Sequence, residues 1–122
     1  MIKEQLINAW IALHHADKKS PEYDKHFWAV REVWQLSRKL PDTCLEFINE
    51  VRRQDGSELI LASLAAGPLE DVLVHYGPQL VEQVEALARK DVQFRKLLGA
   101  VWRNNIAEDV WVRVQRVAGP SF

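Results

Sequence analysis

The four histidines are the residues best suited to acid–base or metal chemistry, since imidazole titrates near neutral pH and binds metals. Two of them follow a carboxylate by four residues, Glu22 with His26 and Asp71 with His75. On a helix this spacing puts both members of a pair on one face, and two such pairs that met could hold a metal ion in a small metal-binding protein or hydrolase. The H-E-x-x-H, Glu-x-x-His and adjacent His-Asp patterns of helical metalloenzymes are absent. We therefore expect local hydrogen bonds within each pair, and no catalytic residue, metal ion or cofactor.

The residues that nucleophilic catalysis and nuclease activity require are also missing from the sequence. Cys44 is the only cysteine, has no activating neighbour in sequence and lies on an apolar stripe, which is typical of a small buried side chain. The segment Arg103-Asn104-Asn105 begins like the motif of HEPN-type helical ribonucleases, but the histidine of that general acid–base pair does not follow. No G-x-S-x-G, G-x-x-x-x-G-K-[ST] or G-x-G-x-x-G segment is present. The sequence therefore favours a protein that is not an enzyme.

Tryptophans, arginines and carboxylates near expected helix ends are the remaining candidates for function. The chain has five tryptophans, and tryptophan and arginine are favoured anchors of protein interfaces. Two carboxylate pairs, at 70–71 and 108–109, fall in the first turn of a predicted helix, where they offset the helix dipole and cap free N–H groups; alternatively they form an acidic contact patch. The predicted partner-binding residues are Glu70, Asp71, Trp102, Arg103, Glu108, Asp109, Trp111 and Arg113.

The elements that position these residues are predicted from the prolines and the apolar spacing. Proline suits the first turn of a helix, so Ser20-Pro21 and Leu40-Pro41 indicate helix starts. Gly67-Pro68 and Gly77-Pro78 each indicate the end of one helix and the start of the next. With helical apolar spacing between these marks, we expect about eight short antiparallel helices in a hairpin array or irregular bundle, at 2–16, 22–39, 42–54, 58–66, 68–76, 78–90, 92–103 and 107–117.

The apolar stripes predict which side chains form the core. Trp10 and Trp34 lie on stripes and are expected to be buried, whereas Trp28 lies off the main stripe of its helix. The segment 110–114 alternates like a strand, but no second strand is available to pair with it, so we favour a helix. The fold class is therefore all-α, with a single domain over 1–122 and a short tail at 119–122.

Composition and charge limit the classes of partner that this chain is expected to bind. A chain of 122 residues, 48% hydrophobic and 27% charged, suits one globular domain. The net charge of −1 argues against nucleic-acid binding. The first residues do not show the charged and apolar pattern of a signal peptide, and no uncharged apolar run reaches membrane-spanning length, so we expect a cytoplasmic protein that does not bind membranes. Residues 41–90 hold four basic and nine acidic groups, and this acidic block is either a solvated surface or a surface for a basic partner.

One stretch of the chain resembles a family of small proteins. It runs from about Leu59 to Arg113 and contains Ala66-Gly67-Pro68-Leu69-Glu70-Asp71-Val72-Leu73, Tyr76-Gly77, Glu85, Ala88, Phe94-Arg95, Leu98-Gly99-Ala100-Val101-Trp102 and Trp111. The family that this pattern resembles is an uncharacterised bacterial domain of unknown function. The resemblance implies a helical bacterial protein and brings no activity with it.

These observations together favour a non-enzymatic protein-interaction domain. Its partner is expected to be another protein with a basic surface, as for an immunity-type or adaptor protein, and self-association into a homo-oligomer is an alternative. The metal-binding or hydrolytic alternative requires the Glu22–His26 and Asp71–His75 pairs to converge in space.

Overall fold

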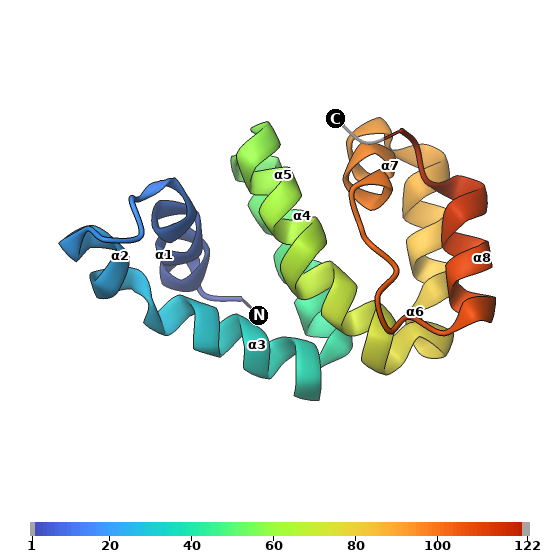
Figure 1. Cartoon of the computed structure of the whole chain (residues 1–122), viewed down its shortest axis with the longest axis horizontal. Helices are drawn as coiled ribbons and strands as arrows, with labels where there is room; N and C mark the ends of the chain where they lie inside the picture. Colours follow the sequence, from blue (N-terminus) through green and yellow to red (C-terminus); the bar gives the residue numbers. More distant parts are fainter. Residues whose placement is uncertain (1, 121–122) are drawn as a thin grey trace.

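The computed structural model of the chain describes residues 2–120 and is all-α over that range, without strands (Figure 1). The elements are α1 (Glu4–His15), α2 (Pro21–His26), α3 (Trp28–Lys39), α4 (Pro41–Gln54), α5 (Glu58–Leu64), the π-helical turn η1 (Ala65–Leu69), α6 (Glu70–Lys90), α7 (Val92–Gly99) and α8 (Glu108–Val117). The predicted fold class is confirmed. The alternating segment at 110–114 is helical, as expected, because it lies within α8.

The central feature is a helical stretch of 33 residues, Glu58–Lys90, formed by α5, η1 and α6 and kinked at Tyr76. The predicted break at Gly67-Pro68 is wrong, because the helix continues through η1, whereas the break predicted at Gly77-Pro78 is confirmed by the kink beside it. The described residues form fewer separate helices than the eight predicted. Pro68 lies inside η1, whose wider hydrogen-bonding pattern accommodates a residue without an N–H group. Before Pro78 the chain bends at Tyr76 (φ −135°, ψ 24°) and then continues as helix.

Several helix starts have side-chain caps. The hydroxyls of Ser20 and Ser57 accept hydrogen bonds from backbone N–H groups at the starts of α2 and α5, and the Asp91 carboxylate does so for α7. Pro21 and Pro41 occupy first-turn positions, as predicted. Two predicted boundaries differ from the structure: the expected helix 22–39 is divided into α2 and α3 by a turn at residue 27, and α7 ends at residue 99 rather than 103.

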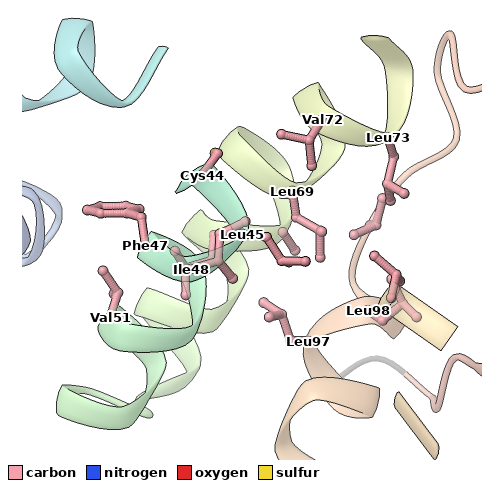
Figure 2. Packing of buried hydrophobic residues seen from close by; sticks show 14 of the residues in the cluster. Cys44, Leu45, Phe47, Ile48, Val51, Leu69, Val72, Leu73, Leu97 and Leu98 are labelled. Carbon is pink, nitrogen blue, oxygen red and sulfur yellow. The ribbon is translucent and has the colours of Figure 1, made fainter. Parts of the chain in front are cut away.

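In Figure 1, α4 and α5 lie in the middle of the molecule, with α1, α2 and α3 on one side and α6, α7 and α8 on the other. Figure 2 shows the centre of the core, where apolar side chains of α4 face those of η1, α6 and α7. The labelled members are Cys44, Leu45, Phe47, Ile48, Val51, Leu69, Val72, Leu73, Leu97 and Leu98.

The tryptophans expected in the core divide between core and surface. Trp10 is buried, at 2% exposure, and contacts Phe47 edge to face with a centroid distance of 5.8 Å. Trp34 is 50% exposed, so its predicted burial is wrong. The buried line of α3 runs instead through the small residues Ala29, Val33 and Ser37.

The central helix also meets the length and composition criteria for crossing a membrane, with a mean hydropathy of 1.3 in its most apolar window. The core helix of a soluble protein meets the same criteria. In this chain Leu64 and Leu69 are completely buried against neighbouring helices.

Candidate functional site

The loop between α7 and α8 presents the most exposed tryptophan of the described chain. Trp102 is 75% exposed, while Val101 before it and Ile106 after it are buried. The Arg103 Nε donates to the backbone oxygen of Ile106 (3.3 Å), and the Ile106 N–H donates back to the Arg103 oxygen (2.8 Å). Asn104 takes the left-handed conformation (φ 43°) that closes this turn, which asparagine tolerates better than most residues. Trp102 is therefore displayed on a short loop that is fixed at both ends.

Two exposed carboxylates follow this loop. Glu108 and Asp109 form the first turn of α8, as predicted, and no side chain caps that helix from Ala107. Negative charge at this end of a helix interacts favourably with the helix dipole. Both groups remain accessible to solvent, so we define Trp102, Arg103, Glu108 and Asp109 as the Trp102 surface.

Trp111 and Arg113, which were also predicted to bind a partner, contribute to the packing of α8. Trp111 is half-buried and packs against the core. The Arg113 guanidinium makes a bidentate ion pair with the Glu85 carboxylate of α6. Its Nε donates to Oε2 at 3.0 Å, and its Nη2 donates to Oε1. The hydrogen bonds from Arg113 lower the pKa of the Glu85 carboxyl and raise the pKa of Arg113 itself. This pair attaches α8 to the central helix.

Glu70 and Asp71 lie in the first turn of α6, as predicted, but η1 leads directly into this helix and no side chain caps it, so the two carboxylates have no capping role. The central helix runs through both positions, and the backbone N–H groups there are already within it. Asp71 instead faces α3: its Oδ2 accepts a hydrogen bond from the Ser37 hydroxyl (3.0 Å), and its Oδ1 lies 3.7 Å from Arg38 Nη2. The predicted contact residues therefore belong to separate sites.

The second site is a groove beside the π-helical turn, which we call the π-turn groove. It has a volume of about 150 Å³ and lies between α1, α3 and the central helix. Isolated π-turns within α-helices occur frequently at functional sites. The groove is lined by Trp10, His14, Val30, Val33, Trp34, Ser37, Ser63, Gly67, Pro68 and Asp71.

The groove combines aromatic rings with one carboxylate. The His14 ring lies against Trp10 with a centroid distance of 4.1 Å, and burial, followed by the nearby charges of His15 and Lys18, lowers its pKa to about 4. His14 is therefore neutral at physiological pH. Asp71 Oδ1 accepts no hydrogen bond from the described residues, which leaves it able to accept one from a ligand.

Sequence reasoning missed most of this groove. Trp34 was assigned to the core, and His14, Ser37 and Gly67 were not proposed as site residues. The available signal was the spacing of Trp34 and Arg38, which puts an indole and a guanidinium one helical turn apart. In the structure the Arg38 guanidinium carbon lies 4.6 Å from the centroid of the Trp34 ring.

The histidine–carboxylate pairs remain local or separate. His26 Nε2 and Glu22 Oε1 are 2.8 Å apart, as expected for a hydrogen bond within α2. His75 is exposed on α6, and Asp71 makes its contacts with α3 instead. Across residues 2–120, no group of three or more histidine, cysteine or carboxylate side chains is arranged to hold a metal ion. The convergence that the metal-binding alternative requires is therefore not seen in this part of the chain.

Cys44 is a core residue, as predicted. Its side chain is completely buried. Burial, with a smaller contribution from the negative charge of Asp71, raises the pKa of the thiol to about 12. The thiolate, which is the nucleophilic form, is therefore scarcely populated at neutral pH.

These features define a small all-α domain with an aromatic groove and an exposed tryptophan loop. The sequence model of a family of unknown function, DUF6869, matches residues 16–121, and the chain belongs to this family. The match confirms the family type that the 59–113 pattern suggested and extends it toward both ends of the chain. No curated protein and no solved structure shows a significant similarity.

Proposed function

We propose that this chain is a non-enzymatic protein-interaction domain, of the immunity or adaptor type, that binds the basic surface of a partner protein in the cytoplasm of a bacterium. The observation that carries this proposal is Trp102, an indole 75% exposed on a short loop, which the exposed carboxylates of Glu108 and Asp109 follow along the chain.

The physical properties of this surface suit protein recognition. Indole rings supply a large apolar contact area at low entropic cost, and they are enriched among residues that dominate binding energy. The hydrogen bonds between Arg103 and Ile106 order the loop before binding, which reduces the ordering cost on association. The carboxylates favour a positively charged partner and increase its rate of association with this surface.

The proposal is tested by affinity capture from the native host at low salt, followed by measurement of the affinity of the captured protein. We expect Trp102→Ala to weaken binding by at least 2 kcal/mol, about thirtyfold, as is typical of an interface hot spot. The double variant Glu108→Gln/Asp109→Asn should bind more slowly and lose most of the salt dependence of association. Trp28→Ala is the matched control, since Trp28 is a partly exposed tryptophan (39%) on α3, and it should leave the affinity unchanged.

Two results would contradict the role of the Trp102 surface. If no protein is captured at low salt, or if Trp28→Ala weakens binding as much as Trp102→Ala does, the Trp102 surface is not the binding site. Sedimentation of the purified chain identifies the case in which the partner is a second copy, because the Trp102→Ala variant would then shift from dimer to monomer.

A further inference from the structure

Gly67 differs from Gly77 and Gly99, because no residue beyond its two chain neighbours would contact a side chain there. Glycine is unfavourable inside a helix, but directly before Pro68 it avoids the clash that a Cβ would make with the proline ring. At Gly77 an added Cβ would lie 2.9 Å from Val110, and at Gly99 it would lie 2.0 Å from the backbone oxygen of Gly119, so packing excludes a side chain at both. At Gly67 a Cβ would meet nothing within 4 Å, and the φ angle is not positive.

The absent side chain keeps one wall of the π-turn groove open, since Gly67 lines it. Pro68 next to it and the wide turn of η1 shape the same wall. A ligand of this groove must fit a volume of about 150 Å³ with mainly apolar walls and a single carboxylate.

The chain itself places a guanidinium beside two residues that line the groove, Trp34 and Asp71. The guanidinium of Arg38 lies over the Trp34 ring at 4.6 Å and approaches Asp71 Oδ1 at 3.7 Å. A planar cation thus stacks on the indole and faces the carboxylate, which are the two interactions that recognise arginine. The neutral imidazole of His14 adds no repulsive charge at physiological pH.

Arg38 is poorly held in this position. Its contact with Asp71 is too long for a hydrogen bond, and its Nε is buried without a hydrogen-bond partner. Its side chain is also 36% exposed, so it has room to move toward solvent. A second guanidinium that binds Asp71 through two hydrogen bonds would replace the long Arg38–Asp71 contact with a bidentate ion pair, which is stronger.

We propose that the π-turn groove receives an arginine side chain of the protein partner, which displaces Arg38 from Asp71 and stacks on Trp34. The inference rests on the proposed function in one respect, because a partner protein supplies the arginine. It does not depend on the Trp102 surface, which is made by the α7–α8 loop and the start of α8.

The test is a titration of the full chain with the peptide acetyl-Gly-Arg-Gly-amide, followed by NMR of the indole N–H signals, with the Trp34 signal assigned from Trp34→Phe. The matched peptide carries citrulline, which has nearly the shape of arginine but no charge. We expect the arginine peptide to shift the Trp34 signal and the citrulline peptide to bind at least tenfold more weakly.

Three variants give effects of different sign. Asp71→Asn should weaken arginine binding at least tenfold, since the amide retains an acceptor for Ser37 but carries no charge. Gly67→Leu should abolish binding by filling the groove, and the melting temperature of the same variant checks that it folds. Arg38→Gln should tighten binding severalfold, because the internal competitor is gone.

The last variant is decisive, since a role of Arg38 in binding the peptide would give the opposite sign. Weaker binding by Arg38→Gln, equal binding of the citrulline peptide, or no Trp34 shift with millimolar arginine peptide would each overturn the proposal. These results are independent of host-protein capture through Trp102, so the failure of one proposal is distinguishable from the failure of the other.

Discussion

The neighbouring arginines Arg52 and Arg53 at the end of α4 should differ greatly in their contribution to stability. Arg52 is buried, at 4% exposure, and its guanidinium donates to Asn49 Oδ1 (2.9 Å), Asp91 Oδ2 (2.9 Å) and Gln93 Oε1 (3.0 Å). Because Asp91 also caps α7, this one side chain connects α4 to the start of α7.

The expected cost of Arg52→Ala follows from these contacts. Removing one partner of a buried ion pair costs about 3–5 kcal/mol. The Asp91 side chain is 34% exposed and remains hydrogen-bonded to the Phe94 N–H, so water can solvate it and the lower end of that range applies, about 3 kcal/mol. For 122 residues the unfolding entropy is about 0.26 kcal/mol per kelvin, so the melting temperature should fall by about 12 °C.

The matched control is Arg53→Ala, one residue along the same helix. Arg53 pairs with Glu50 at 3.0 Å, but both side chains are about half exposed, and surface pairs of this kind contribute about 0–1 kcal/mol. Urea unfolding followed by circular dichroism measures both variants, with equal slopes confirming a comparable unfolding reaction. If Arg52→Ala costs less than 1 kcal/mol, or no more than Arg53→Ala, the assignment of Arg52 as a buried connection is wrong.

Three further predictions concern other parts of the chain. Gly99→Ala should release the segment around Gly119, because the new Cβ would overlap the backbone oxygen of Gly119. The hydrogen bond from the Gly119 N–H to the Arg95 oxygen would then be lost, at a cost of about 1 kcal/mol in stability. Faster amide hydrogen exchange at Gly119 would show this loss. Folding lowers the pKa of His14 from 6.5 to about 4, so the folded state binds fewer protons than the unfolded state in this window and stability should fall as pH drops from 6.5 to 4. The full shift corresponds to about 3.4 kcal/mol, which solvent screening of this half-buried group reduces to about 1–2 kcal/mol, and urea unfolding of His14→Gln across this range should show a flatter pH dependence. The Cys44 thiol should react with a disulfide reagent only as fast as the protein opens, and rapid reaction of the folded protein would contradict its burial.

The fold class was predictable from the sequence because helical apolar spacing and proline-marked helix starts agree with each other. The kink beside Gly77-Pro78 was predictable from the same marks, but the continuity of the helix through Gly67-Pro68 was not. Gly67-Pro68 has the local properties of a helix end, yet Leu64 and Leu69 on either side of it are fully buried, and a π-turn lets the helix continue through the proline. Tertiary packing decided the outcome there.

The site was only partly predictable for a related reason. Trp102 was identified because it lies beside a polar turn, and it is exposed. Trp34 was assigned to the core because it lies on an apolar stripe, but α3 packs through Ala29, Val33 and Ser37, whose small size permits close contact. Asp71 was assigned to a helix end, whereas its partners come from α3, more than thirty residues earlier in the chain. Such long-range pairs are not encoded in local spacing.

The continuity of the helix through Gly67-Pro68 limits how the chain can be divided. The Gly-Pro dipeptide at 67–68 has the composition of a linker, but it lies in the middle of the core helix, so it is neither a site for limited proteolysis nor a junction between two fragments that fold alone. Exposed segments within the described chain occur instead at 17–19 and 102–105. An inserted tag or an engineered break should be tolerated at 17–19, while at 102–105 it would interrupt the loop that displays Trp102.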